Sequence, residues 1–528
     1  MHATYSIHQQ RPLRLLRGAN TSDLVSSVCV SGALSLVCCV LDPQTMVHWF
    51  LIPVFISGVI IGVDCFAWLR SRMDLLDPIG WVGAYGYYFF FVAPILTVMW
   101  GYRTTELAET PNWRDWIGWM AVLNCCGIIV YFLVRRFLQN REQTSRSTWC
   151  FRHNSLIHVM AAALPLTALV QILIYARFGG IWGFMETFSA HDKAFDGMGW
   201  QFLIAESFPC LLAIFILVYK RQTLKQAPWT AIALLIAAFF ITKLVFGGLR
   251  GSRSNTIWAI FWLVGAIHAW IKPVPRRFLM IGVTFLVAFM YVYGFYKQEG
   301  TDALEIIRSQ DEMQSTSRRT GRTLDAALLG DLARSEIQAY ELYRLVAISD
   351  YDYAGGSTYI GALTVLIPKS IRPDWIPSKV EKGTEALYGK GTYSSEYRQA
   401  SQVYGLAGEA MLNFTPLSVP FVFAGLAYVV VKVRAMHSLH PNDARRLLLP
   451  FLVIGCIVVL NSDLDNVVVF LLTTSLPAFL AIKCCTRSIS SPSVHRNRLE
   501  KMNISFPPSE KASPWREACV VAGYKPCE

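Results

Sequence analysis

The stretch FGGLRGSRSNT (246–256) holds two arginines, Arg250 and Arg253, three residues apart among glycines and hydroxyl side chains. A guanidinium group presents a planar fork of donors that matches pairs of phosphate oxygens, and its charge cannot be titrated away. The glycines would let the backbone approach a ligand closely. The stretch therefore suits a diphosphate, although two arginines that snorkel to lipid headgroups would give the same pattern.

Ionisable residues inside apolar segments are the next candidates, because each is costly in a bilayer unless it is paired or hydrated. The clearest are Asp64, Glu206, Lys243 and Glu409. Asp64 lies near Arg70, with which we expect a local ion pair at the membrane surface. Glu409 is either a catalytic carboxylate or one half of a structural ion pair with an arginine.

The amino-acid composition indicates the class of protein in which these residues lie. Of the 528 residues, 54% are hydrophobic and only 16% are charged, and the mean hydropathy is +0.38. Soluble domains carry about 25% charged residues. These values favour an integral membrane protein and exclude a disordered chain or a nucleic-acid-binding module. The cysteines have no C-x-x-C spacing, so neither a disulfide framework nor a zinc site is indicated.

A membrane-crossing helix needs about 20 mostly apolar residues, and the sequence has twelve candidate segments. We therefore predict an all-α polytopic membrane protein of about twelve transmembrane helices. The last two segments share a short turn at 461–466 and could instead form a re-entrant pair. The predicted limits are 24–41, 46–69, 79–100, 115–134, 155–176, 201–219, 228–247, 255–271, 278–296, 406–431, 447–461 and 466–482.

Lys and Arg concentrate in alternate connections, and such residues stay on the cytoplasmic side of a membrane. This pattern predicts that both termini are cytoplasmic and that one large, partly helical loop lies on the outer face between helices 9 and 10. The net charge of +12 is then mainly an orientation signal. The predicted regions are a cytoplasmic tail (1–23), helices 1–9 (24–297), the outer loop (298–404), helices 10–12 (405–483) and a disordered cytoplasmic tail (484–528).

The outer loop has its own internal pattern. Apolar or small residues recur at helical spacing between 324 and 348, which predicts one amphipathic helix with the hydroxyl of Ser335 on its apolar face. The loop is also rich in tyrosine, contains Trp375 and lacks phenylalanine. Aromatic rings with a polar edge suit a sugar, which has both C–H faces and hydroxyls. An interfacial aromatic belt is the alternative explanation.

Three stretches are similar to segments of one known family: FGGLRGSRSNT (246–256), GGSTYIGALTVLIPKSIRPDWIPSK (355–379) and YGLAGEAMLNFTPLSVPFVFAGLAY (404–428). The second shares the family's Thr-Tyr, Ile-Pro-Lys/Arg and Pro-x-Lys elements, and the third shares its Gly-Glu and Asn-Phe elements. Met411 departs from the pattern, since an aromatic residue is expected near it. With this order of features, the sequence resembles the Wzy-type O-antigen or exopolysaccharide repeat-unit polymerases of bacteria.

The resemblance implies a glycosyltransferase in the bacterial inner membrane, with the outer loop in the periplasm. Its substrate would be an oligosaccharide linked to undecaprenyl diphosphate, and the glycan would pass to a sugar hydroxyl of another lipid-linked repeat unit. This scheme needs neither a metal nor a cofactor. The implied partners are the lipid-linked oligosaccharide, the lipid bilayer and a chain-length regulator, but no nucleic acid.

Within that scheme, fixed cations stabilise the charge that develops on the diphosphate, and a carboxylate in a dry site acts as the base. The candidate catalytic residues are Glu409, Arg250 and Arg253. Lysines rank below arginines because an ammonium group is a poorer bidentate partner. The candidate substrate-binding residues are Arg344, Arg372, Lys369 and Lys379 for the diphosphate and Tyr404 and Asn413 for the sugar hydroxyls.

Two other functions stay open. An O-antigen ligase shares the lipid donor, but that family is associated with a histidine in the outer loop, and 298–404 contains none. A polysaccharide flippase or transporter would have a similar number of helices but little need for a long outer loop. The sequence lacks the G-x-x-x-x-G-K-[ST] motif, which makes an ATP-driven machine a poor fit.

Overall fold

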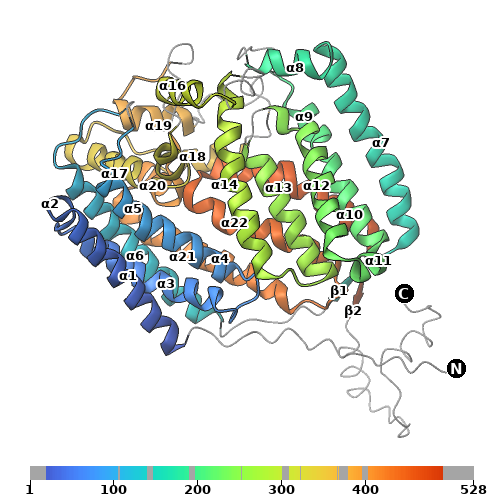
Figure 1. Ribbon diagram of the computed structural model, residues 1–528, viewed down its shortest axis with the longest axis horizontal. Coiled ribbons are helices and arrows are strands. Elements are labelled where there is room, and N and C mark those ends of the chain that lie inside the picture. The colour runs from blue at the N-terminus through green and yellow to red at the C-terminus, as the bar shows by residue number, and fades with distance from the viewer. Residues whose placement is uncertain are drawn as a thin grey trace, which may run out of the picture.

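The computed structural model describes residues 20–104, 107–139, 147–189, 195, 197–250, 253–299, 308–320, 323–364, 367, 379–394 and 402–490. Within these ranges, nine helical segments are long and apolar enough to cross a membrane, which confirms a polytopic helical membrane protein (Figure 1). They are α1 (Thr21–Leu41), α3 (Leu51–Leu69), α4 to α5 (Pro78–Met99), α6 (Trp113–Gln139), α7 (His153–Arg177), α9 and α10 (Gly199–Tyr219), the segment around α21 (Pro416–Ser438), the segment ending in α22 (Ala444–Asn461) and α23 to α24 (Leu464–Cys485).

The other predicted segments are also helical. Among the described residues, α12 (Trp229–Val245) and the segment Thr256–Ile271 are apolar but shorter, and α14 (Arg276–Glu299) covers the predicted segment 278–296. Thr256–Ile271 combines most of α13 (Arg253–Ala266) with the π-helical turn η4 (Ile267–Ile271). The last two predicted segments are full helices of 18 and 22 residues. A count of twelve crossings stays a prediction.

The predicted tenth span has different limits in the structure. The sequence places one helix over 406–431, but the chain forms a short helix, α20 (Gly405–Asn413), and then a separate span that contains α21 (Val419–Ala435). The helix breaks at Phe414 and Thr415, directly before Pro416. Proline has no N–H to donate and disfavours helical geometry in the residue before it. Glu409 therefore lies in a helix that precedes the membrane span.

Two short strands add a small sheet to the helical protein. β1 (Ser147–Phe151) pairs with β2 (Thr486–Ser490) in antiparallel register. The prediction that the whole tail 484–528 is disordered is therefore wrong for its first residues, 484–490, which end α24 (Leu476–Cys485) and form β2. Backbone pairing between distant segments orders them, and strands of only five residues are too short to show a clear periodicity in the sequence.

The basic connections meet at one end of the helical bundle. Arg434 binds Asp77 at 3.1 Å, and Arg221 at the start of α11 (Arg221–Gln226) donates to Asn442 at 3.0 Å. Phe151 of β1 and Arg221 both contact the ring of Trp270, with a centroid distance of 5.8 Å for Phe151 and 3.9 Å between the Arg221 guanidinium carbon and the ring centroid. The connections that the sequence assigns to one side of the membrane thus contact one another, while the side that faces the cytosol stays a prediction.

Close helix contacts form the core. Gly127 on α6 faces Phe423 on α21, and a Cβ atom added to this glycine would lie 2.6 Å from the phenylalanine ring. Gly58 on α3 faces Phe91 in the same way, also at 2.6 Å. Small residues at helix contacts let backbones approach closely in membrane proteins. These contacts join α6 to α21 and α3 to the segment Pro78–Met99.

The long loop folds into short helices at the end of the bundle opposite to the sheet (Figure 1). They are α16 (Gln310–Thr320), η6 (Ala326–Asp331), α17 (Ser335–Tyr343), η7 (Arg344–Ile348), α18 (Ser357–Leu363) and α19 (Lys379–Tyr388). The prediction of one amphipathic helix over 324–348 is wrong, because the helix breaks at 332–334. The carbonyls of Leu328 and Leu332 accept hydrogen bonds from the hydroxyls of Tyr88 and Tyr85, which draws the chain onto the segment Pro78–Met99.

Asp64 pairs with Arg135 of α6, and not with Arg70 as the sequence suggests. Arg70 instead contacts Asp23 near the start of α1. Asp64 is 1% exposed, and the guanidinium of Arg135 also lies 4.2 Å from the ring centroid of Phe132. The ion pair therefore joins α3 to α6 inside the protein.

Asp64→Leu should destabilise the protein by about 3–5 kcal/mol, because it leaves the buried guanidinium of Arg135 without its carboxylate. The double variant Asp64→Leu/Arg135→Leu should recover most of that loss, since an apolar pair has no uncompensated charge. Thermal unfolding of the detergent-purified variants measures both effects. A double variant as unstable as the single one would contradict the assignment of Arg135 as the ion-pair partner of Asp64.

Candidate active site

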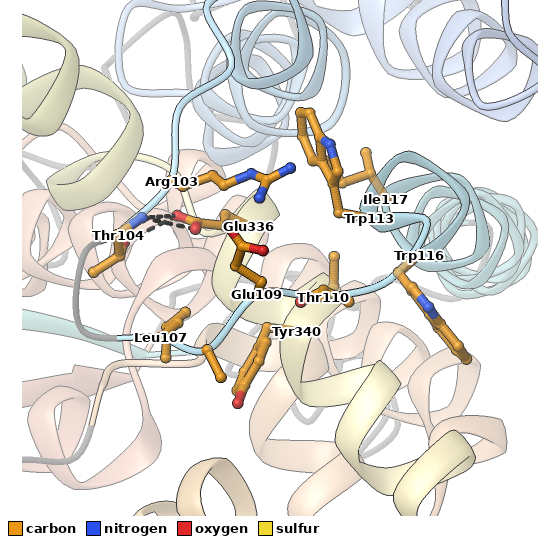
Figure 2. Close-up of a pocket in the computed structure, with 12 residues that line it drawn as sticks. Arg103, Thr104, Leu107, Glu109, Thr110, Trp113, Trp116, Ile117, Glu336 and Tyr340 are labelled. Atoms are coloured by element: carbon orange, nitrogen blue, oxygen red, sulfur yellow. Dashed lines mark hydrogen bonds between the residues drawn. The ribbon is translucent and has the colours of Figure 1, made fainter.

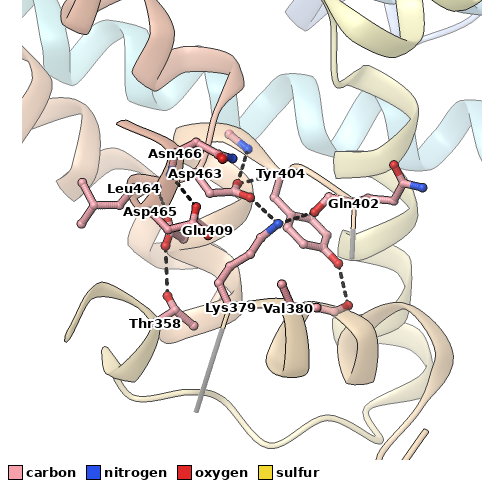
Figure 3. Close-up of polar contacts among 12 residues, drawn as sticks. Thr358, Lys379, Val380, Gln402, Tyr404, Glu409, Asp463, Leu464, Asp465 and Asn466 are labelled. Atoms are coloured by element: carbon pink, nitrogen blue, oxygen red, sulfur yellow. Dashed lines mark hydrogen bonds and ion pairs between the residues drawn. The ribbon is translucent and has the colours of Figure 1, made fainter. Parts of the chain in front are cut away.

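A buried polar cluster lies where the loop helices meet the bundle (Figure 3). Its least buried member, Lys379, is only 6% exposed. Side chains come from the loop helices α17, α18 and α19, from the helix α20 with the residue before it, and from the turn between α22 (Leu449–Asn461) and α23 (Leu464–Phe470). The polar cluster consists of Glu341, Thr358, Lys379, Tyr404, Glu409, Asn413 and Asp463.

Asp463 connects α20 to the turn after α22. Its Oδ1 accepts hydrogen bonds from the N–H groups of Tyr404 at 2.8 Å and Gly405 at 2.9 Å. Gly405 has φ +73°, and a Cβ atom there would collide with the carbonyl oxygen of Leu460. Only glycine allows this close approach at a left-handed position, so the geometry of the turn requires Gly405.

Glu409 is 3% exposed and is held at both carboxyl oxygens. The hydroxyl of Thr358 donates to Oε1 at 3.1 Å, and the N–H of Leu464 donates to Oε2 at 2.6 Å. Asn413, one helical turn after Glu409, donates from Nδ2 to the hydroxyl oxygen of Thr358 at 2.6 Å. The two predicted site residues of α20 therefore share one partner on α18.

Burial and the neighbouring carboxylate of Asp463 raise the pKa of Glu409 to about 8. The hydrogen bonds from Leu464 and Thr358 act in the opposite direction and do not cancel the rise. At neutral pH most Glu409 carboxyls therefore carry a proton. A carboxyl that titrates near neutral pH can accept or release a proton in a reaction.

Glu341 of α17 is a second buried acid in the cluster. It is 0% exposed, and no described residue forms a hydrogen bond with either carboxyl oxygen. Burial, followed by the charge of Asp463, raises its pKa well above the ordinary value for glutamate. A Cβ atom added to Gly408 would lie 2.6 Å from Oε2 of Glu341, so α20 packs directly on this carboxyl.

The side chains of Lys379 and Tyr404 form ion-pair and hydrogen-bond contacts within the protein. The ammonium group of Lys379 forms an ion pair with Asp463, donates to the carbonyl of Gln402 and lies 4.8 Å from the ring centroid of Tyr404. The hydroxyl of Tyr404 donates to the carbonyl of Gly383 at 2.6 Å. Both side chains thus tie α19 to the start of α20 (Figure 3).

Arg344 makes its contacts outside the polar cluster. Its guanidinium binds both carboxylate oxygens of Asp350, at 2.8 and 2.9 Å, and donates to the carbonyl of Ala386 at 3.3 Å. The other predicted loop cations, Lys369 and Arg372, lie outside the described residues. Whether these residues complete a diphosphate site stays a prediction.

The predicted arginine turn lies between α12 and α13, where η3 (Gly248–Arg250) precedes the helix that begins at Arg253. Only the backbone of these two arginines is described. Tyr296 donates to the carbonyl of Leu249 at 2.9 Å, and a Cβ atom on Gly247 would lie 2.7 Å from Cγ of Glu206. The turn is therefore fixed by neighbouring helices, and a buried acid packs beneath it.

Sequence reasoning missed Glu341, Thr358 and Asp463 as members of the site. Thr358 lies in the stretch that resembles the polymerases, but its hydroxyl gives no signal in the sequence. Asp463 lies in the turn at 461–466, and Glu341 lies beside the predicted apolar stripe. A polar residue flanking a stripe is ordinarily exposed, so only the folding of α20 onto α17 reveals its burial.

Within the described ranges, no group of three or more His, Cys, Asp or Glu side chains could hold a metal ion. The carboxylates of Glu409 and Asp463 instead bind backbone N–H groups, a hydroxyl and an ammonium group. Comparison of the chain with protein-family models, with curated proteins and with solved structures finds no match.

Proposed function

We propose that the protein polymerises lipid-linked oligosaccharide repeat units on the periplasmic face of a bacterial inner membrane. The glycan would pass from undecaprenyl diphosphate to a sugar hydroxyl of another lipid-linked repeat unit. One observation carries the proposal: two of the stretches that resemble the polymerases pack on each other. The N–H of Gly355 donates to the carbonyl of Asn413 at 2.7 Å, and Thr358 binds Glu409.

The reaction follows from the chemistry of these residues. Glu409, in its deprotonated form, takes the proton of the attacking hydroxyl as the new bond forms at the anomeric carbon. The bond from this carbon to the diphosphate breaks, and its electron pair leaves with the diphosphate. Arg250 and Arg253 stabilise the charge that develops there. Thr358 and the backbone of Leu464 cover the carboxylate, so α18 has to move aside before an acceptor sugar can reach it.

Deletion of the gene tests the proposal. Cells without the protein should carry a single repeat unit on the surface anchor in place of a ladder of chain lengths, and the gene on a plasmid should restore the ladder. Polymer that stays on its lipid carrier would instead identify a ligase. Repeat units that stay on the cytoplasmic face would identify a flippase.

A proton-coupled carrier of lipid-linked saccharide is the second candidate function. The observation that favours it is the pair of buried acids, Glu341 and Glu409, because protonatable carboxyls in membrane proteins often belong to proton relays. Inverted vesicles that contain lipid-linked repeat units test this function. Movement of the saccharide to the lumen that depends on a pH gradient and on Glu341 would support the carrier.

Arg250→Lys should reduce polymer formation at least tenfold, because lysine keeps the positive charge but loses the fork that binds paired phosphate oxygens. Ladder length in cells that express equal amounts of the variant measures the effect. Arg277→Lys at the other end of the molecule is the matched control and should leave the ladder unchanged. Full activity of Arg250→Lys would remove the assignment of paired diphosphate contacts.

A further inference from the structure

A groove separate from the polar cluster lies between α17 and the connection that leads from α5 (Ala93–Met99) to α6 (Figure 2). It encloses a cavity of about 210 Å³. Pockets that hold drug-sized ligands measure roughly 300–1,000 Å³, so this groove has room for a smaller group, such as one sugar ring. The lining combines aromatic rings with charged groups: Arg103, Glu109, Trp113, Trp116, Glu336 and Tyr340.

The polar groups of the groove are held in place. The carboxylate of Glu336 accepts hydrogen bonds from the N–H of Thr104 at 2.7 and 2.9 Å and from its hydroxyl at 2.9 Å. Each carboxylate oxygen has more than one lone pair, so Glu336 keeps acceptor capacity for a ligand hydroxyl. The guanidinium of Arg103 lies 5.0 Å from the ring centroid of Trp113 and supplies donors beside the same rings.

The aromatic rings of the groove differ from those of an interfacial belt. Trp116 packs edge-on against Tyr343 of α17, at 5.4 Å between ring centroids. Trp119, three residues further along α6, is 53% exposed and contacts Trp49 instead. Trp119 has the exposure expected of a belt residue, whereas Trp113 and Trp116 line the groove beside fixed hydrogen-bonding groups.

We infer that this groove binds one sugar residue of the oligosaccharide, with a C–H face against Trp113 or Trp116 and hydroxyls bound by Glu336 and Arg103. The inference rests on the proposed function for the identity of the saccharide. The helix α17 joins the two sites, since Glu336 and Tyr340 line the groove while Gln338 donates to the carbonyl of Tyr404 at 2.7 Å in the polar cluster. The groove and the polar cluster therefore lie on two different faces of the same helix, α17.

Binding of a lipid-free oligosaccharide to the purified full-length protein tests the inference. The probe is the repeat-unit oligosaccharide released by mild acid from the surface polysaccharide of the native host. Trp113→Ala should weaken binding about tenfold. Arg103→Gln, which changes an exposed side chain, should weaken it about threefold and covers the case in which Trp113→Ala fails to fold. The control Trp119→Ala should bind as the wild type does.

The outcomes separate this inference from the proposed function. Wild-type affinity in both groove variants would overturn the inference, even if deletion of the gene collapses the ladder. Loss of binding in these variants alone would support it, even if deletion of the gene leaves the ladder intact and the proposed function fails. Failure of the wild-type protein to bind the probe would also overturn it and would leave the groove as packing between α6 and α17.

Discussion

Glu409→Gln should reduce polymer formation at least roughly a hundredfold, the lower end of what a general base contributes. Glutamine keeps the size of the side chain; its oxygen can accept from the N–H of Leu464 and its NH2 group can donate to the hydroxyl oxygen of Thr358, so the fold around it should persist. What it loses is the ability to take a proton. Ladder formation in cells and single-turnover transfer with purified lipid-linked repeat units measure the loss.

The pH dependence of the wild type sharpens this prediction. The pKa of Glu409 rises from 4.5 to about 8 in the folded protein, and only the deprotonated form is a base. Transfer should therefore increase as the pH rises towards about 8 and then level off. Glu409→Gln should remove this dependence together with the activity.

The stability of the folded protein should fall with rising pH, whereas the transfer rate should rise. The carboxyl of Glu409 has a higher pKa in the folded than in the unfolded state. Its contribution to the free energy of unfolding is fully present below the unfolded pKa and is lost as the pH rises through the folded pKa. Glu409 should thus make the protein progressively less stable between pH 4.5 and about 8. Thermal unfolding of wild type and Glu409→Gln at both ends of this range measures the difference.

Glu312→Gln on α16 is the matched control, because it makes the same chemical change at an exposed position. It should leave both the transfer rate and its pH dependence unchanged. Full activity of Glu409→Gln would show that the acceptor needs no base at this position. The cluster would then have a structural role only.

That the protein is helical and crosses a membrane several times was predictable from the sequence, because a membrane imposes a strong local requirement. Among the described residues the predicted apolar segments are helical, with a break inside 406–431, and several of the basic connections contact one another. The limits were wrong where one residue breaks a helix inside an apolar run, as Pro416 does after α20. A proline alone does not predict such a break, since Pro165 lies inside α7 without ending it.

The site was predictable only in part. Glu409 and Asn413 stand four residues apart on one helix face, and the structure brings them together with Thr358. The partners Glu341 and Asp463 come from segments far away in the sequence. Their burial follows from the folding of the loop onto the bundle, which no local pattern encodes. The ion pair of Asp64 illustrates the same limit, since its partner is on another helix.

Lys379→Met should destabilise the protein by about 3–5 kcal/mol, because it removes the counter-charge of a fully buried carboxylate. Asp463 is 0% exposed, and its ion pair with Lys379 joins α19 to the turn between α22 and α23. The double variant Lys379→Met/Asp463→Asn should recover most of this loss. Asparagine keeps an oxygen that can accept from the N–H groups of Tyr404 and Gly405, and it leaves no charge unpaired.

The double variant also separates two roles of Lys379. If the ammonium group serves the fold, as its contacts with Asp463 and Gln402 indicate, the double variant should polymerise nearly as well as the wild type. Because the charge of Asp463 raises the pKa of Glu409, the rise of its transfer rate should also move to lower pH. A double variant that is stable but inactive at every pH would instead place Lys379 on the diphosphate of the substrate. The thermal unfolding temperature and the pH profile of transfer, measured on the same preparations, decide between these roles.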